Sequence, residues 1–417
     1  MNSVYFETII VGAGAAGLYC ACNLKEEAAA SVLILEKNKK AGRKLLMTGN
    51  GQCNVTHGGS IKDFVTHYGD KGRSIRGLLQ KYSNIQLRRF LEGLGLPLTE
   101  REDGKVFPVS MAAGDVLKTL LDEIARKGIS IRYESEVTGI EYAESHFTIH
   151  TKNSHYRCKN LIIATGGCSY AGTGSDGKML DILAGALNIE VVKPRPVLAP
   201  VYVEDYCFAE LSGISFKDIY GRIETKDGRK LHDFTGDLLF TSKNLSGPTI
   251  LNNSRRMAPG LVLTVNFAAP AAGPEIIARC KRDFPGNGKS PQVYMSETLK
   301  LPKRFAAIIA DKLALSHKKV SQLTGKEISA LSSELTEHKF TIQRVGGFNE
   351  AMATGGGVSL NCVNPKTMSH SLYEGLYIIG EAVDVDGDTG GYNLQFAYSS
   401  AKAAADSISD RKAELST

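Results

Sequence analysis

Apolar and polar residues alternate at the start of the chain in a way that predicts a strand, a turn and a helix. Residues 8–11 read as a buried strand, and a helix is expected from about Ala15. A second apolar run over residues 32–35 ends at Glu36. Two buried strands joined through a helix are typical of the parallel sheet of an α/β protein.

Similar patterns return much later in the chain. Apolar residues alternate with polar ones on both sides of Val137 and predict two strands, and residues 161–167 read as a buried strand that closes on two glycines. Residues 375–384 repeat this pattern and include Gly380 and Glu381 after the apolar run.

The middle of the chain has a different pattern. Residues 197–270 contain short strands separated by turn signals, whereas residues 275–333 read as helical, interrupted by the loop "PGNGKSP". A chain of 417 residues exceeds what one hydrophobic core normally organises. We therefore expect two or three domains, and the insertion of one domain into another is one possible arrangement.

Glycines in the first turn indicate what the first domain binds. Gly12, Gly14 and Gly17 form the pattern GxGxxG between the first strand and the first helix. The first glycine permits the tight turn, the second lets the backbone approach a pyrophosphate, and the third lets the helix pack closely on the strand. Glu36 ends the second strand, where its carboxylate can accept both hydroxyls of an adenosine ribose. This arrangement predicts a bound dinucleotide.

A second glycine motif, "DGDTGGYNLQFAYSSAKAA" over residues 386–404, lies near the end of the chain. A helix is expected over residues 393–405, so Gly390 and Gly391 would stand at its N-terminus, where free N–H groups and the positive helix dipole attract electron-rich groups. FAD needs more protein contacts than NAD because its ribityl chain and isoalloxazine ring must also be held. This remote segment therefore favours FAD, with the flavin pyrimidine ring at the helix start.

Composition narrows the class of protein. The apolar and charged fractions, 42% and 23%, are those of a soluble globular protein, and no apolar run reaches the roughly 18 residues that a membrane-spanning helix needs. The chain starts with a strand rather than a signal segment, so a cytoplasmic location is expected. The eight cysteines are scattered, and we expect neither a disulfide framework nor a metal site.

The formal charge of +6 is concentrated in one helical segment. Residues 275–330 contain 11 lysines and arginines against five acidic residues. Such an excess is usually a solvated helical face. It is also the electrostatic footprint of a protein that binds a polyanion such as RNA.

Longer motifs resemble one known family. They are "AGRKLLMTGNGQCNVTH" (residues 41–57), "VFPVS" (106–110), "ATGG" (164–167), "LSGPTIL" (245–251), "ATGGGVSLNCVNPKTM" (353–368) and "GEAVDVDGDTGGYNLQFAYSS" (380–400). Together they resemble the BaiN/RdsA-like flavoprotein family, also called YhiN-like, which includes aminoacetone oxidases. The resemblance spans the chain apart from the basic segment.

This resemblance implies a fold and a set of domains. It implies an α/β protein with a glutathione-reductase-like Rossmann FAD-binding domain, interrupted by a β-barrel domain that carries a helical subdomain. The expected ranges are 1–194 and 351–417 for the two parts of the FAD-binding domain, 195–272 for the first part of the barrel, 273–335 for the helical subdomain and 336–350 for a return strand of the barrel.

The motifs also identify the residues expected to contact FAD. Arg43 and Lys44 follow Gly42 in the loop that, in such folds, runs beside the pyrophosphate and the ribityl chain. The full set of expected contacts is Gly12, Gly14, Ala15, Ala16, Gly17, Glu36, Lys37, Gly42, Arg43, Lys44, Thr48, Gly49, Gly51, Asn54, Val137, Thr165, Gly166, Gly167, Gly380, Glu381, Gly391, Tyr392, Asn393 and Leu394. Residues 172–177, "GTGSDG", also spell GxGxxG, but no strand precedes them, and we interpret them as a turn and a helix cap.

Two residues are candidates for proton transfer. Hydride delivery to a C=C bond requires a proton for the other carbon, and Cys53 or Tyr392 could donate it. Alternatively, Cys53 is a small buried apolar residue and Tyr392 packs against the flavin ring. Cys53 has no second cysteine nearby in the sequence, which argues against a dithiol–disulfide reductase.

The sequence says less about the substrate than about the cofactor. Family members generally have His, Pro and Arg where this chain has Ser242, Ala171 and Gln52, so the surroundings of the flavin differ. The resemblance permits reduction of an activated C=C bond in uridine of ribosomal RNA or in an enone, and it permits oxidation of an aminoacetone-like amine. We favour reduction, with NAD(P)H as a transient donor. A flavin-containing RNA-binding protein is the non-enzymatic alternative, and the oligomeric state is left open.

Overall fold

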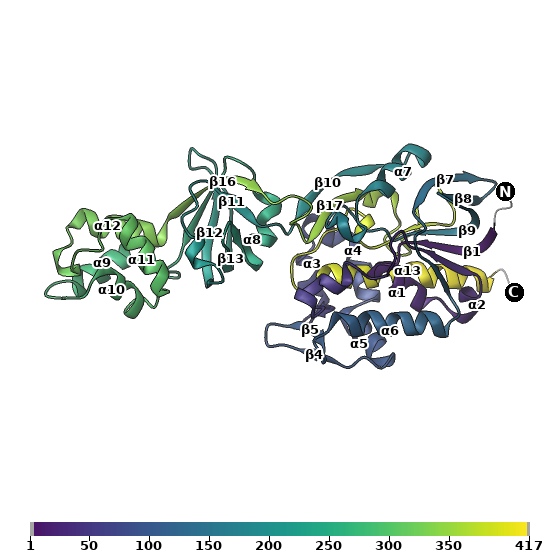
Figure 1. Ribbon diagram of the computed structural model, residues 1–417, viewed down its shortest axis with the longest axis horizontal. Helices are drawn as coiled ribbons and strands as arrows, with labels where there is room; N and C mark the ends of the chain where they lie inside the picture. Colours follow the sequence, from purple (N-terminus) through teal and green to yellow (C-terminus); the bar gives the residue numbers. More distant parts are fainter. Residues whose placement is uncertain (1–3, 415–417) are drawn as a thin grey trace. The chain divides into compact units, whose positions relative to one another are not determined.

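The computed structural model describes residues 4–414 and divides the chain into two compact units (Figure 1). The first unit combines the residues up to Val197 with those from Ala351 onward, and the second unit is Leu198–Glu350. Each unit has its own cluster of buried apolar residues. The second unit is therefore an insertion into the first along the chain.

A seven-stranded sheet forms the centre of the first unit. Most neighbours along it are parallel, and the β7–β8–β9 part is antiparallel. The order is β6 (Ser130–Arg132), β2 (Val32–Leu35), β1 (Val4–Val11), β9 (His155–Ile163), β8 (His146–Thr151) and β7 (Val137–Ala143), while β18 (Leu376–Ile378) pairs with β9.

Strand β9 pairs with strands from both ends of the chain. Its first half pairs antiparallel with β8, whereas Leu161 to Ile163 pair in parallel with both β1 and β18. The residues of β2 and of the second half of β1 are all buried, as expected for strands covered on both faces. The late strand β18 thus completes a sheet that begins at the N-terminus.

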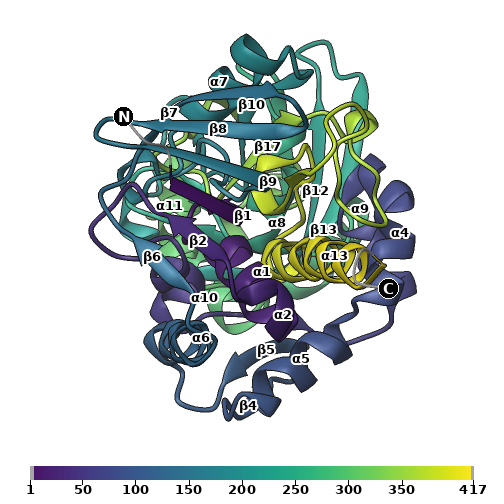
Figure 2. The same ribbon diagram turned by 90° about the vertical axis from the view of Figure 1, so that its right-hand side faces the viewer.

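Helices from both chain ends cover one face of this sheet. Helix α1 (Ala15–Asn23) contacts α13 (Tyr392–Glu414) and α6 (Ala113–Arg126), and Figure 2 shows α1, α2 (Glu26–Ala29) and α13 together on one side of the strands. Helix α7 (Lys178–Leu187) contacts strand β7. Helix α13 is longer than the expected 393–405 because its apolar face packs along α1.

Smaller elements complete the first unit. They are the three-stranded sheet β3 (Thr56–His57), β5 (Lys105–Pro108) and β4 (Leu98–Glu100), the helices α3 (Ile61–Thr66), α4 (Gly72–Lys81) and α5 (Asn84–Gly93), and the antiparallel pair β10 (Val191–Val197) and β17 (Ala353–Val358). The β10–β17 pair carries the chain out of the first unit and back into it.

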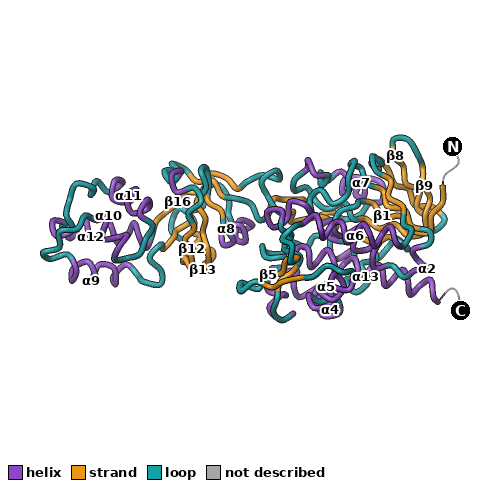
Figure 3. Tube along the Cα trace, turned by 60° about the horizontal axis from the view of Figure 1, so that its bottom comes forward, coloured by secondary structure: helices purple, strands orange, loops and turns teal. Residues whose placement is uncertain are grey.

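The second unit is a closed barrel with helices attached. The barrel order is β11 (Val201–Val203), β14 (Leu245–Ser246), β13 (Lys230–Phe240), β12 (Ser215–Glu224), β15 (Val262–Asn266) and β16 (His338–Val345). Helix α8 (Pro248–Asn253) follows β14, and four helices lie between β15 and β16 in the chain: α9 (Gly273–Asp283), α10 (Pro291–Glu297), α11 (Lys303–Lys312) and α12 (Gly325–Thr336). Figure 3 shows these four helices clustered at one end of the barrel.

The predicted fold class is confirmed, since the first unit has the parallel sheet and helices of a Rossmann-type domain. One expected strand lies earlier in the chain than predicted: β9 runs from His155 to Ile163, and Ala164 to Gly167 form a loop. The loop is needed because Ala164 and Thr165 pack against the turn after β1. Among residues 4–414, no helix combines the length and the hydropathy required to cross a bilayer.

Candidate cofactor site

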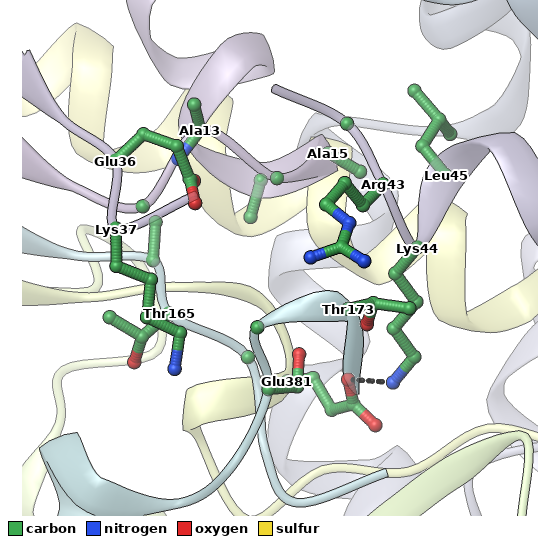
Figure 4. A pocket seen from close by; sticks show the side chains of 18 of the residues that line it. Ala13, Ala15, Glu36, Lys37, Arg43, Lys44, Leu45, Thr165, Thr173 and Glu381 are labelled. Atoms are coloured by element: carbon green, nitrogen blue, oxygen red, sulfur yellow. Dashed lines mark hydrogen bonds and ion pairs between the residues drawn. The ribbon is translucent and has the colours of Figure 1, made fainter. Parts of the chain in front are cut away.

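A cavity opens in the first unit where the carboxyl ends of β1, β2 and β9 meet. It is lined by the turn after β1, by Glu36 after β2, by the loop around Lys44, by Thr165 after β9, and by Glu381 (Figure 4). The first turn of α13 contributes the remaining wall. Ligands of open α/β sheets bind at this edge of the sheet, so the cavity stands where the fold predicts a cofactor.

The turn between β1 and α1 has the geometry of a pyrophosphate-binding loop. Gly12 has a φ of +106°, and a Cβ there would lie 2.6 Å from the Ala164 carbonyl oxygen. A Cβ on Gly14 would meet nothing within 4 Å, so the backbone is open to the cavity at that point. The N-terminus of α1 directs unpaired N–H groups and a positive dipole toward this space.

Glu36 is held in a fixed orientation at the end of β2. Its side chain is 7% exposed, and one carboxylate oxygen accepts a hydrogen bond of 2.9 Å from the Ala13 N–H. The other oxygen accepts from the backbone N–H and the side-chain amide of Asn38, at 2.8 and 2.7 Å. A carboxylate fixed in this way fits the two hydroxyls of a ribose.

An ion pair joins early and late segments of the chain within the cavity. Lys44 Nζ lies 2.7 Å from one oxygen of Glu381, as the dashed line in Figure 4 shows. The other oxygen of Glu381 accepts from the Thr354 N–H at 2.7 Å. The Thr354 hydroxyl oxygen in turn accepts from the backbone N–H groups of Cys168 and Ser169. The loops after β9 and β18 are thereby fixed to one residue of β17.

The start of α13 corrects the sequence interpretation of Gly390 and Gly391. A Cβ on Gly391 would lie 2.7 Å from the carbonyl group of Thr56, and one on Gly390 would lie 3.2 Å from the Tyr392 ring. At these two positions a side chain would meet neighbouring parts of the protein, and neither glycine is among the residues that line the cavity. Leu394 and Asn393 line the cavity instead, while the Asn393 side chain exchanges two hydrogen bonds with Gly387.

The residues present fit FAD. The ribose site at Glu36, the glycine turn for the pyrophosphate and the N-terminus of α13 follow one another along the wall of one cavity. Thr165 also lines it, and its hydroxyl is buried with no hydrogen-bond partner among residues 4–414, as expected for a group that bonds to a ligand. We infer that FAD is held here by these groups.

Most of the expected cofactor residues lie on the cavity wall. These are Gly12, Gly14, Ala15, Ala16, Glu36, Lys37, Gly42, Arg43, Lys44, Thr48, Val137, Thr165, Gly166, Glu381, Asn393 and Leu394. They come from segments far apart in the sequence, and folding brings them to one place.

The other expected cofactor residues do not line the cavity: Gly17, Gly49, Gly51, Asn54, Gly167, Gly380, Gly391 and Tyr392. Four of them are glycines where a side chain would collide with the protein: besides Gly391, a Cβ on Gly17 would lie 2.0 Å from the Gly12 oxygen, one on Gly167 2.5 Å from Thr354, and one on Gly380 2.7 Å from Ala16. At these positions the motif has glycine because the protein packs closely around the site.

Cys53 and Tyr392, the candidates for proton transfer, both lie outside the lining of the cavity. The Cys53 side chain is fully buried, and burial raises the pKa of its thiol to about 11. The Tyr392 ring stacks between His57 and His67, at centroid distances of 5.4 and 4.1 Å, and burial holds its pKa well above the ordinary value. Their proton-transfer role stays a prediction that this geometry does not support.

Sequence reasoning missed several parts of the cavity wall, including Ser135, Met352 and Val385, and two others lie near the end of β2. The first is Asn38, for which the sequence carries no motif signal. The second is the loop after Tyr170, which we interpreted as a turn and a helix cap. Helix α7 begins at Lys178 as expected, but its N-cap is Gly177, no side chain caps it, and Asp176 accepts only a long hydrogen bond of 3.4 Å from the Lys178 N–H. However, Thr173 to Gly177 also line the cavity, and the glycine spacing "GTGSDG" was the signal that could have indicated this.

Comparison with known proteins finds relatives that match almost the whole chain. The model of the HI0933-like protein Rossmann domain matches residues 6–407. A ribosomal RNA dihydrouridine synthase of Haemophilus influenzae is 32% identical, and the match covers 98% of this chain and 99% of that protein. A protein of the same description from Escherichia coli is 30% identical, with 97% and 98% covered. A 3-dehydro-bile acid delta(4,6)-reductase of Clostridium scindens is 29% identical, with 96% and 98% covered.

Solved structures share the fold at low sequence identity. A flavocytochrome c3 fumarate reductase in its open conformation has a TM-score of 0.50 at 14% identity, with 98% of this chain and 78% of that chain covered. A 3-ketosteroid delta1-dehydrogenase of Sterolibacterium denitrificans has a TM-score of 0.50 at 11% identity, with 98% and 100% covered. At this identity the likeness concerns the fold alone.

Proposed function

Because the chain belongs to the HI0933-like family, whose model matches residues 6–407, we propose that it is an FAD-dependent oxidoreductase that reduces an activated C=C bond. The family assignment agrees with the resemblance recognised in the sequence motifs. The observation that supports the proposal best is the single cavity that combines a pyrophosphate turn, a ribose carboxylate and the start of α13.

The reduced form of bound FAD would supply the hydride for one carbon of the double bond, and a proton must reach the other carbon. The protein binds and orients the cofactor through the Gly12–Gly14 turn and Glu36. The N-terminus of α13 offers positive dipole density where negative charge accumulates on the ring. Lys44 and Glu381 fix the two loops that flank this space.

The favoured substrate is a uridine in ribosomal RNA. Two relatives that match almost the full length, at 32% and 30% identity, are described as ribosomal RNA dihydrouridine synthases. In that reaction the C5=C6 bond of the pyrimidine accepts a hydride and a proton and becomes a single bond. We further propose NAD(P)H as a transient donor and the cytoplasm as the location.

Reduction of a small conjugated enone is the second candidate. It is favoured by the 29% identity to a bile acid delta(4,6)-reductase over 96% of this chain. The chemistry at the flavin is of the same type, but a small apolar substrate needs no phosphate contacts. The two candidates therefore differ in what the inserted unit has to do.

In the basic segment, residues 275–330, some lysines and arginines form ion pairs and others do not. Arg279 and Arg282 lie near Asp283, and Lys289, Lys312 and Lys318 pair with Glu297, Glu334 and Glu327. The remaining six are exposed and make no ion pair with any residue in the range 4–414: Lys281, Lys300, Lys303, Arg304, Lys319 and Lys326.

Two of these unpaired cations, Lys303 and Arg304, occupy the first turn of α11, which contains no acidic residue. Positive charges are unfavourable at the positive end of a helix dipole, although Arg304 also donates a hydrogen bond of 3.4 Å to the Glu210 carbonyl oxygen. We propose that the helical subdomain, 273–335, binds ribosomal RNA phosphates here, beside a barrel formed by 195–272 and 336–350. The FAD-binding domain then comprises 1–194 and 351–417.

The experiment compares ribosomal RNA from cells that lack the protein and are complemented with it or with variants. Replacing Lys300, Lys303, Arg304 and Lys319 by Ser should lower dihydrouridine and, in vitro, reduce the salt dependence of RNA binding (the slope of log K against log salt) by roughly 3. The matched control replaces Lys62, Lys152, Lys193 and Lys366 of the first unit, which are also exposed and make no ion pair with any residue in the range 4–414. No dihydrouridine with the unaltered protein would exclude RNA as substrate.

The reaction type is tested separately by mixing the purified protein with candidate donors under anaerobic conditions. Flavin absorbance should bleach rapidly with NADH or NADPH. Rapid bleaching by aminoacetone, with none by either nicotinamide, would reverse the direction of the reaction. Protein that stays colourless after reconstitution with FAD would exclude both candidates.

A further inference from the structure

The loop after β9 forms part of the wall of the cofactor cavity. It consists of residues 171–177, and Thr173 to Gly177 line the cavity. Its start is fixed, because Thr354 accepts hydrogen bonds from Cys168 and Ser169 directly before it. Gly174, with a φ of +120°, lets the loop pass so close to Asn38 that a Cβ would lie 2.6 Å from the amide nitrogen.

Asn38 connects this loop to the ribose carboxylate. Its side-chain amide donates to Glu36 at 2.7 Å and to the Thr173 carbonyl oxygen at 3.0 Å. Its side-chain oxygen accepts from Arg43 at 2.9 Å. One amide group therefore contacts the carboxylate expected at the ribose, the loop opposite it and a cation on the cavity wall.

An ion pair makes a second connection between the loop and the end of β2. Lys37 Nζ lies 2.8 Å from Asp176, and the two side chains are only 25% and 26% exposed. Both residues line the cavity. Because a partly buried pair is screened less by salt than an exposed one, it can hold the loop against the end of β2.

We propose that residues 171–177 form an adenosine clasp, closed by Asn38 and by the Lys37–Asp176 pair, which retains FAD by its adenosine half. The clasp rests on the proposed function only in taking FAD as the cofactor. Because Glu36 marks the ribose end of the cavity, the clasp encloses the adenosine and leaves the start of α13 to the flavin ring. It sets the residence time of FAD and the preference for FAD over FMN, which lacks the adenosine.

The test measures flavin release from the purified holoprotein, followed by the rise in flavin fluorescence after dilution. We expect Lys37→Met and Asp176→Asn to speed FAD release about threefold, and Asn38→Ala about tenfold because Asn38 also bonds to a charged group. Titration of the apoprotein with ADP should show affinity losses of the same size. Binding of FMN should change less than twofold, since FMN does not reach the clasp.

The matched control is Lys39→Met, which removes a neighbouring ion pair, Lys39–Glu134 at 3.8 Å, that is exposed and outside the cavity lining. This variant should release FAD at the wild-type rate. Exchanging the partners, Lys37→Asp with Asp176→Lys, should restore slow release, which a general packing defect would not allow.

Unchanged FAD release in all three clasp variants would overturn the clasp and leave the proposed function intact. Equal losses for FMN and ADP would also overturn it, because the variants would then have loosened the whole site. A wild-type protein that binds no FAD would instead overturn the proposed function itself.

Discussion

At the scale of single residues, two glycines of the same turn have opposite surroundings. A Cβ on Gly17 would collide with the Gly12 oxygen at 2.0 Å, whereas one on Gly14 would enter open space at the cavity. Gly17→Ala should therefore lower the free energy of unfolding by about 1–3 kcal/mol even without cofactor. Gly14→Ala should lower it by less, because the added Cβ meets no protein atom within 4 Å, but should weaken FAD binding.

Thermal unfolding with and without FAD distinguishes the two variants. Gly14→Ala should lower the melting temperature of the holoprotein only, and Gly17→Ala that of both forms. Equal behaviour of the two variants would contradict the assignment of Gly14 to the cofactor and Gly17 to packing.

Cys53 provides a second prediction at this scale. Its thiol is fully buried and stays protonated at neutral pH, since burial raises its pKa to about 11. Cys53→Ala should keep the rate of substrate reduction within about twofold and cost roughly 1 kcal/mol of stability through the small cavity left. A loss of rate of 100-fold or more, with FAD still bound, would restore Cys53 as the proton donor.

At the scale of elements, the junction between α12 and β16 should be sensitive to acid. Burial raises the pKa of Glu334, but hydrogen bonds from His338 and Lys312 outweigh it and bring the pKa to about 2. A carboxylate with a depressed pKa stabilises the fold above its unfolded value of 4.5, and this stability is lost as the pH falls toward 2.

Glu334→Gln should therefore lower the free energy of unfolding at pH 7 by about 1–3 kcal/mol. The difference from the unaltered protein should shrink between pH 4.5 and pH 2, as chemical denaturation at each pH would measure. Glu297→Gln serves as the control, because that carboxylate is exposed and pairs with Lys289 at the surface. A difference that persists at pH 2 would mean that the Glu334 charge is not the cause.

At the scale of the whole molecule, the insertion should be removable. Val197 pairs with Ala353 across the β10–β17 ribbon, so the chain leaves and re-enters the first unit at neighbouring positions, about 5 Å apart. The buried apolar residues of the first unit form a cluster without members from the second. A chain in which a short Gly-Ser linker replaces 198–350 should fold and bind FAD.

Absorbance of the bound flavin and the shift of the melting temperature on adding FAD would measure this. The same protein should not modify ribosomal RNA, because the unpaired cations of the helical subdomain are gone. A shortened chain that is unfolded and colourless would show that the first unit depends on the second.

The sequence by itself determined the cofactor turn, the strand that ends at Glu36 and the family. These features depend on residues close together in the chain: glycine spacing between a strand and a helix restricts the backbone locally, and apolar periodicity identifies the elements on either side. The α/β class follows from the same local patterns, and the long motifs carry the FAD assignment.

Only the tertiary structure decided which motif residues face the cofactor and which serve packing. Gly391 admits the backbone of Thr56, the Tyr392 ring stacks with His57 and His67, and Thr173 reaches Asn38. In each case the partner belongs to a segment far away in the chain, so no local pattern records the contact. A glycine required by a ligand and a glycine required by a neighbouring backbone read alike in sequence, because both positions exclude a side chain, and only the folded chain shows what occupies the space.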